Sequence, residues 1–125
     1  MSLADWQRQN AVNLDGVFLG TKHAIPLMAQ SGGGSIINIS SVAGLIGAGG
    51  LAGYCATKGG VRLFTKAVAI ECAAGDTNIR VNSVHPGIID TDIWGKEISG
   101  IAQGQPELMV EGANRINCLL YTSDA

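Results

Sequence analysis

Apolar and small residues recur at intervals of three and four positions along the first 30 residues of the chain. The positions on this stripe are Leu14, Val17, Phe18, Thr21, Ile25 and Met28. This spacing predicts an amphipathic helix over residues 4–29. Asn13, Gly16 and Gly20 fall on another stripe of the same helix. Glycine inside a helix costs up to ~1 kcal/mol relative to alanine, so the two glycines indicate that something packs closely there.

Two short apolar segments further along the chain predict β-strands, over residues 35–40 and 79–85. The apolar residues of the first segment are nearly continuous rather than alternating, which is typical of a strand covered on both faces in a parallel sheet. A glycine-rich loop over residues 41–53 and a helix over residues 54–73 connect the two strands. The order helix, strand, helix, strand predicts an α/β layered fold.

The predicted second helix carries two apolar stripes. One consists of Val61, Phe64, Val68 and Cys72, and the other of Leu63, Ala67 and Ile70. Two stripes predict a helix that is buried on more than one side. Its own sheet would cover one side, and a partner subunit is the candidate for the other.

The composition is that of a single folded domain. The 125 residues are 46% hydrophobic and 14% charged, whereas soluble domains average about 25% charged and disordered chains have the opposite balance. Eight basic and ten acidic residues give a net charge of −2, with no cluster of lysine and arginine. A nucleic-acid groove or an anionic membrane surface requires such a cluster, so we expect no nucleic-acid partner and no membrane partner.

The cysteines and histidines form no disulfide or metal-site pattern. Three cysteines lie far apart without a Cys-x-x-Cys pair, which favours a reducing compartment and hence a cytoplasmic location. His23 and His85 have no partner at metal-ligand spacing, so we expect structural roles for them and no metal. The longest stretch without a strongly polar residue, residues 42–56, is shorter than the ~18–20 apolar residues of a membrane helix.

Tyr54 and Lys58 are the most informative pair, because a spacing of four places them one above the other on a helix face. A cation about 4 Å from a phenol, at an effective dielectric near 20, favours the phenolate by roughly 4 kcal/mol and so favours proton transfer. Taken alone, Tyr-x-x-x-Lys is also a common feature of ordinary helix surfaces. Ser41 follows the first strand, at the sheet edge where α/β proteins bind ligands, and its hydroxyl can donate to a substrate oxygen.

Four segments in unbroken order resemble the short-chain dehydrogenase/reductase family. They are Val-Asn-Leu-Asp-Gly-Val-Phe around Asn13, Asn-Ile-Ser-Ser-Val-Ala-Gly around Ser41, the pair Tyr54 and Lys58, and Ile-Arg-Val-Asn-Ser-Val-His-Pro-Gly ending at Gly87. The segments are most similar to bacterial hydroxysteroid and cyclopentanol dehydrogenase-like members. The resemblance covers residues 1–116. It implies an α/β fold with a Rossmann-like, doubly wound parallel sheet, of which this chain would hold the second, catalytic half.

The resemblance implies a role for each matched residue. Tyr54 would be the general acid/base, Lys58 would support it and bind the nicotinamide ribose, and Ser41 would orient the substrate oxygen. Asn13 would hold a water that links Lys58 to solvent, with a packing role as the alternative. The nicotinamide end of the cofactor would be bound by Tyr54, Lys58, Pro86, Gly87, Ile89 and Thr91. Trp94 is a candidate for the wall of the substrate pocket, again with packing as the alternative.

As a whole, the resemblance implies an NAD- or NADP-dependent enzyme that acts on a secondary alcohol or ketone and forms a dimer or tetramer. The family's glycine-rich phosphate-binding turn and its selector for NAD or NADP have no counterpart before Asn13, so the choice of cofactor stays open. With half of the sheet missing, we expect an exposed strand edge and an uncovered apolar face. Residues 117–125 resemble translated sequencing-adapter read-through and are expected to be a non-native tail. The alternative to an enzyme is a truncated, inactive fragment that acts at most as a dimerising module.

Overall fold

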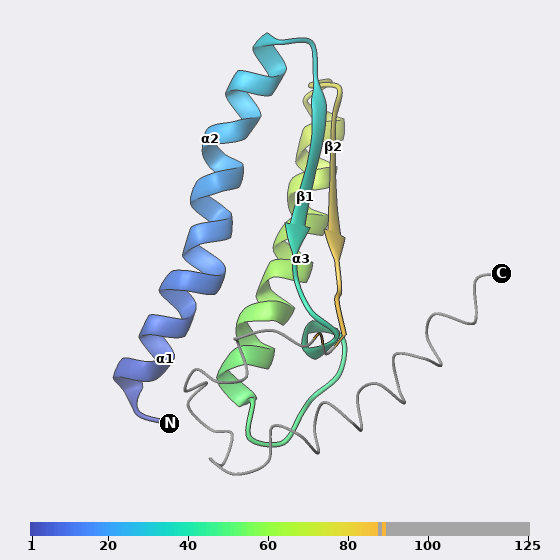
Figure 1. Ribbon diagram of the computed structural model, residues 1–125. Helices are drawn as coiled ribbons and strands as arrows, with labels where there is room; N and C mark the ends of the chain where they lie inside the picture. The colour runs from blue at the N-terminus through green and yellow to red at the C-terminus, as the bar shows by residue number, and fades with distance from the viewer. Residues whose placement is uncertain (88, 90–125) are drawn as a thin grey trace, which may run out of the picture.

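The N-terminal quarter of the chain is one long helical rod. The computed structural model describes residues 1–87 and residue 89. Three consecutive elements make up the rod: α1 (Leu3–Asn10), η1 (Ala11–Asp15) and α2 (Gly16–Gln30), with helical backbone at both junctions (Figure 1). It begins at a capping box, in which the Ser2 hydroxyl accepts from the Asp5 amide while the Asp5 carboxylate accepts from the Ser2 amide. The predicted helix over residues 4–29 is therefore confirmed. The prediction of close packing at its glycines is wrong for the described residues, because a Cβ added at Gly20 would meet nothing within 4 Å and one at Gly16 only the Ala11 carbonyl at 3.9 Å.

The middle of the rod departs from regular α-helical geometry. η1 is a π-helix of five residues, and Asn13 is its central residue. Single π turns inside α-helices are frequent at functional sites. The apolar spacing did not predict this irregularity.

The two predicted strands form a parallel pair connected by a long helix. β1 (Gly34–Ile39) and β2 (Ile79–Val84) run in register from Gly34 opposite Ile79 to Ile39 opposite Val84. α3 (Ala52–Ala74) lies between them in sequence, and a short 3-10 turn, η2 (Val42–Gly44), occupies the loop that precedes it. Both strands and the second helix match the predicted ranges to within two residues.

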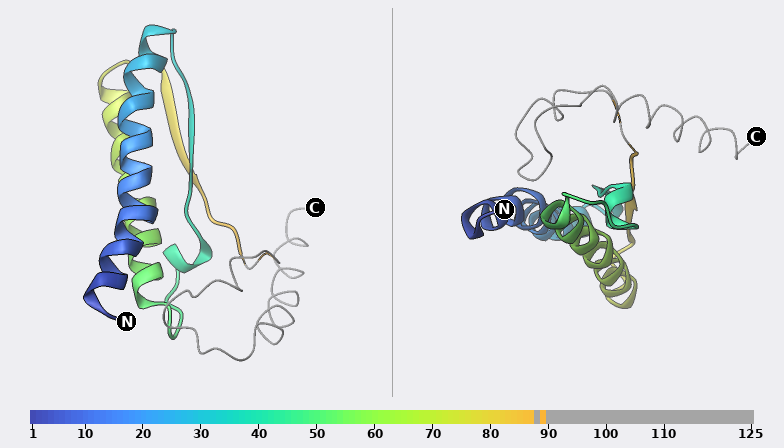
Figure 2. Two further views of the ribbon diagram at one scale, coloured as in Figure 1. Left: turned by 60° about the vertical axis from the view of Figure 1, so that its left-hand side comes forward. Right: turned by 90° about the horizontal axis from the view of Figure 1, so that it is seen from below.

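Both long helices cover the same face of the sheet (Figure 2). The core between them is aliphatic, with Ile36 and Val81 of the strands packed against Val68 and Cys72 of α3, and Met28 of α2 at its margin. The opposite face of the sheet is open, because Ile37 and Ile39 are 59% and 53% exposed. The expectation that the first strand is covered on both faces is therefore wrong for the described residues. Within the part of the chain that the structure describes, this apolar face is uncovered, as expected above.

A buried polar cluster joins both helices to β1. Asn38 points inward from the strand, and its amide donates to the Thr65 hydroxyl on α3 at 3.0 Å. Its side-chain oxygen accepts from the Thr21 hydroxyl on α2 at 3.5 Å. All three residues are at most 8% exposed. Such a cluster fixes the register of both helices on the strand, because any slip leaves a buried amide without its partners.

We expect Thr65→Val to lower the free energy of unfolding by about 1–3 kcal/mol, the cost of leaving a buried donor unsatisfied. Valine matches threonine in shape, so the Asn38 amide loses its acceptor without a change in volume. Urea denaturation of the full chain measures the effect. Thr21→Val is the matched control, since its long 3.5 Å bond predicts a smaller loss; equal losses in the two variants would contradict this account.

Among the described residues, no helix is both long enough and apolar enough to cross a membrane.

Candidate active site

The candidate catalytic residues gather where β1 ends. Asn13 lies on η1, Ser41 directly follows the strand, and Tyr54 and Lys58 lie in the first two turns of α3. The lower part of Figure 1 shows these elements side by side. The sheet edge beyond the carboxyl ends of parallel strands is the usual ligand-binding position in open α/β folds.

Lys58 is tied to the end of β1 by two hydrogen bonds of opposite direction. Its Nζ donates to the carbonyl oxygen of Ile39 at 3.0 Å. Its own main-chain carbonyl accepts from the buried Ser40 hydroxyl at 2.8 Å. We call this pair of bonds the strand–helix clasp. It fixes both the backbone and the ammonium of Lys58 relative to the strand, and burial lowers the pKa of Lys58.

Tyr54 lies one helical turn before Lys58, on the same side of α3. The Lys58 Nζ is 5.6 Å from the centroid of the Tyr54 ring, within the range of a cation–π contact. Tyr54 and Lys58, four residues apart, therefore lie side by side on the helix as their spacing predicts. One short stretch of α3 thus presents a phenol and an ammonium together at the end of β1.

Asn13 approaches the same part of α3 from the neighbouring helical rod. Its amide donates to the Thr57 hydroxyl at 3.2 Å, and this hydroxyl donates in turn to the Tyr54 carbonyl at 2.9 Å. Thr57 is completely buried. The contact holds the π turn against α3 beside Lys58; the water-holding role of Asn13 stays a prediction.

Ser41 is buried and held in an extended conformation. Its hydroxyl oxygen accepts from the Ala43 amide at 3.1 Å, which leaves the hydroxyl proton available for donation. The main-chain oxygen of Ser41 is 3.1 Å from Nδ1 of His85. The Ser41 side chain is therefore held by the Ala43 amide of the following turn. Its carbonyl is held by His85, which directly follows β2.

The two strands stay paired beyond their assigned ends. The Ser40 amide donates to the Val84 carbonyl at 2.8 Å, and the Val42 amide donates to the Pro86 carbonyl at 3.0 Å. This extended pairing brings Pro86 beside the segment that carries Ser41. Gly87 follows Pro86, and both are half-buried, whereas Ile89 is exposed. Of the remaining candidates, Thr91 and Trp94 lie outside the described residues.

Sequence reasoning missed four residues that support the site: Ser40, Gly44, Thr57 and the bridging His85. Ser40, Thr57 and His85 act through main-chain carbonyls or through another side chain. An ideal Cβ on Gly44 would lie 2.6 Å from both the Lys58 carbonyl oxygen and the Ser40 hydroxyl. The only signal of this close packing in the sequence is Gly44 itself, a glycine three positions after Ser41 in the predicted loop over residues 41–53.

The parallel β1–α3–β2 unit, with a phenol and an ammonium at its carboxyl edge, defines an α/β protein with its candidate site at the carboxyl ends of the strands. The chain belongs to the short-chain dehydrogenase/reductase family, since the family model described as short chain dehydrogenase matches residues 1–101. The resemblance deduced from the sequence is thereby confirmed. The family consists of oxidoreductases.

Three known proteins illustrate the relationship. The chain is 53% identical over 87 residues to a cyclopentanol dehydrogenase of a Comamonas species, covering 70% of this chain and 34% of that protein. It is 46% identical over 118 residues to a 3-alpha-(or 20-beta)-hydroxysteroid dehydrogenase of Mycobacterium bovis, covering 92% of this chain and 45% of that protein. The structure of an acetoin dehydrogenase from Enterobacter cloacae superposes with a TM-score of 0.69 at 36% identity, covering 74% of this chain and 38% of that one. The chain thus spans less than half the length of these relatives, and the partial Rossmann-type fold is confirmed.

Proposed function

We propose that this chain is the catalytic half, residues 1–116, of an enzyme that interconverts a secondary alcohol and a ketone using NAD or NADP. The observation that carries the proposal is the strand–helix clasp, which holds the Lys58 ammonium beside the Tyr54 ring at the end of β1. The names of the relatives favour a cyclic or steroid-like alcohol as substrate. Substitution of Tyr54, argued in the Discussion, is the decisive experiment.

The described residues fit a nicotinamide nucleotide. An ammonium has three donors, and Lys58 uses one of them on Ile39. Two donors therefore remain for the hydroxyls of a ribose, a neutral group rich in acceptors. Pro86, Gly87, Ile89 and Thr91 would bind the nicotinamide end. When bound, the cofactor would supply the hydride acceptor or donor, which no amino-acid side chain can provide.

In the proposed reaction, the Tyr54 hydroxyl exchanges a proton with the oxygen of the alcohol or ketone. During oxidation the phenolate takes the hydroxyl proton as the hydride leaves the carbinol carbon, and during reduction the phenol returns a proton. Ser41 donates the proton of its hydroxyl as a hydrogen bond to the same substrate oxygen and fixes its direction. Lys58 lies beside the Tyr54 ring, and Asn13 holds a water that connects Lys58 to solvent. Trp94 would form part of the wall against the substrate.

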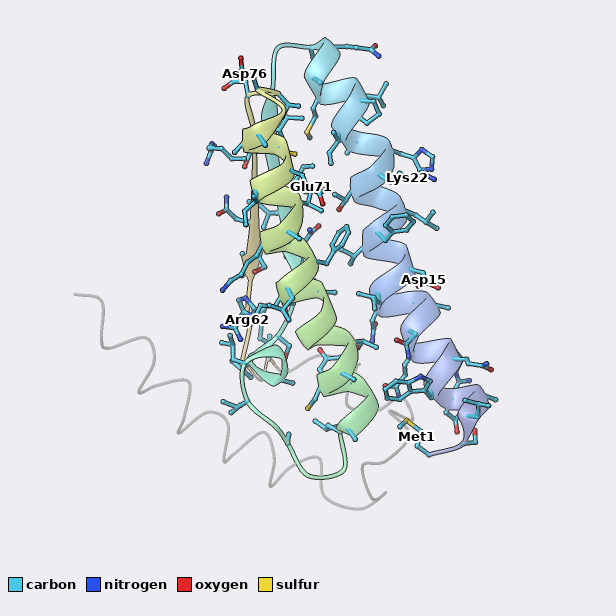
Figure 3. The ribbon with its side chains drawn as sticks, turned by 180° about the vertical axis from the view of Figure 1, so that it is seen from behind. Met1, Asp15, Lys22, Arg62, Glu71 and Asp76 are labelled. Carbon is cyan, nitrogen blue, oxygen red and sulfur yellow. The ribbon has the colours of Figure 1, made fainter. Side chains whose placement is uncertain are left out.

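The second candidate function is a truncated, inactive fragment that acts as a dimerising module. It is favoured by apolar residues on the outer side of α3, where Leu63 and Ile70 are 65% and 70% exposed. Figure 3 turns this outer side of the two helices toward the viewer. The stripe of Leu63, Ala67 and Ile70 would pack against a second copy of the chain. A complete enzyme would use the same stripe in a dimer or tetramer.

We expect the isolated 125-residue chain to show no turnover and no tight binding of NADH or NADPH. The catalytic groups act on a cofactor whose phosphate-binding turn has no counterpart in this sequence, so the nicotinamide end alone would supply the affinity. Titration of the chain into each nucleotide, followed by nucleotide fluorescence, measures the binding. Saturable binding at micromolar concentrations would rule out the second candidate function, the inactive fragment. It would favour a chain that binds the cofactor by itself.

A further inference from the structure

His85 lies one residue beyond β2 and connects that strand to the catalytic serine. Its Nδ1 is 3.1 Å from the main-chain oxygen of Ser41, and its Nε2 is 2.9 Å from the hydroxyl of Ser83. The ring is half-buried. Both of its nitrogens therefore have a partner, one toward the site and one toward the strand from which the histidine comes.

The chemistry of the two partners determines which nitrogen carries the proton. A carbonyl oxygen can only accept, so Nδ1 must carry the hydrogen that it donates to Ser41. In a neutral ring Nε2 is then unprotonated, and it accepts from the Ser83 hydroxyl, which can donate. The Ser41 carbonyl thus selects the tautomer, and the Ser83 hydroxyl is compatible with it because it can donate to Nε2.

The backbone pairing around His85 brings its side chain beside Ser41. The extended pairing of the two strands runs through the Val84 and Pro86 carbonyls. The Val42 amide is thereby held to Pro86, directly beside His85. The imidazole N–H provides a donor from the same segment, and it reaches the carbonyl of Ser41.

We infer that His85 is a positioning residue for Ser41, an inference that rests on the proposed function of Ser41 in binding the substrate oxygen. The Ser41–Val42 peptide is held at its nitrogen by Pro86 and at its oxygen by His85. The Ser41 hydroxyl is held separately, by the Ala43 amide. Without the histidine donor, the peptide plane can tilt and the hydroxyl turns away from the substrate oxygen.

His85→Asn and His85→Gln distinguish the loss of the hydrogen-bond donor at Nδ1 from the loss of the imidazole ring. The amide nitrogen of asparagine lies close to the position of Nδ1, whereas that of glutamine lies close to the position of Nε2. In a complete enzyme that contains this chain, we expect His85→Gln to lower kcat about three- to tenfold, the rate equivalent of one lost hydrogen bond. We expect His85→Asn to retain most of the activity, and the KM for the cofactor to stay unchanged in both variants. Equal activity of the two variants would overturn the inference.

A double substitution tests whether His85 acts through Ser41. In a Ser41→Ala background there is no hydroxyl to orient, so His85→Gln should cause no further loss of kcat. If His85→Gln lowered kcat by the same factor in both backgrounds, His85 would act on the protein structure in general and not through Ser41. That result would overturn the inference. Full activity of Ser41→Ala itself would refute the proposed function of Ser41, which distinguishes the two failures.

The tautomer gives a readout that does not depend on activity. Nitrogen-15 NMR of labelled histidine in the same enzyme should show Nδ1 of His85 protonated and Nε2 unprotonated. The exposed His23 provides an internal reference for a histidine in water. Ser83→Ala should leave Nδ1 protonated, because the Ser41 carbonyl is its partner. An unprotonated Nδ1 in the unsubstituted enzyme would overturn the inference.

Discussion

Tyr54→Phe in a complete enzyme that contains this chain is expected to lower kcat by about three orders of magnitude. General acid–base catalysis contributes about 10²–10⁴-fold to rate, and phenylalanine removes the one hydroxyl that would exchange a proton with the substrate oxygen. Cofactor affinity should change little, because Lys58 and the strand ends would still bind the nucleotide. Steady-state kinetics with NADH fluorescence binding separate the two effects.

If Tyr54→Phe retained substantial turnover, the proton would have to come from another group, and the assignment of Tyr54 as the acid/base would be withdrawn.

A lost ring contact is the competing explanation for a defect at Tyr54. The Lys58 ammonium faces the Tyr54 ring at 5.6 Å, and phenylalanine preserves an aromatic face for it. The strand–helix clasp involves no atom of Tyr54. A loss of kcat in Tyr54→Phe therefore reports on the hydroxyl rather than on the placement of Lys58.

The sequence predicts those parts of this molecule that depend on local spacing. The helices and strands follow from apolar periodicity, and the Tyr54–Lys58 pair follows from the 3.6-residue helical turn. Ser41 could be placed at the sheet edge because it directly follows an apolar strand. These predictions need no knowledge of which segments meet in space.

The supporting contacts could not be predicted, because they join side chains to main-chain carbonyls that lie far away along the chain. Ser40 donates to a carbonyl 18 residues later, and the ring of His85 contacts a carbonyl 44 residues earlier. Every residue has a main-chain carbonyl, so the residue type at a position does not indicate whether its carbonyl accepts such a hydrogen bond. The π turn at Asn13 is similarly invisible, since one inserted residue barely disturbs the apolar spacing of the rod.

The open face of the sheet has a different origin. Ile37 and Ile39 are the residue types of a buried strand, yet both are exposed in the described part of the chain. They belong to a nearly continuous apolar run, which is typical of a strand covered on both faces. The chain spans less than half the length of its relatives. The prediction of a strand covered on both faces thus fails for the described residues, whose two long helices both lie on the other face of the sheet (Figure 2).

Gly44→Ala is expected to lower the free energy of unfolding by about 1–3 kcal/mol and to reduce kcat in the complete enzyme. The backbone of Gly44 does not have a positive φ, so the glycine is required for space rather than for conformational freedom. The added methyl would lie 2.6 Å from the Lys58 carbonyl oxygen and from the Ser40 hydroxyl. One is helix backbone and the other is buried and hydrogen-bonded, so neither can move without separating α3 from the end of β1.

Gly47→Ala provides the matched control for this prediction. Gly47 lies in the same loop, its added Cβ would meet nothing within 4 Å, and its φ is not positive. We therefore expect it to leave kcat unchanged and to alter stability by less than about 1 kcal/mol, in the stabilising direction. Chemical denaturation and steady-state kinetics on both variants measure the contrast. Because the methyl at residue 44 opens the strand–helix clasp, it should displace the Lys58 ammonium from Tyr54 as well as destabilise the fold. A Gly44→Ala enzyme with normal stability and normal kcat would mean that the clasp does not position Lys58.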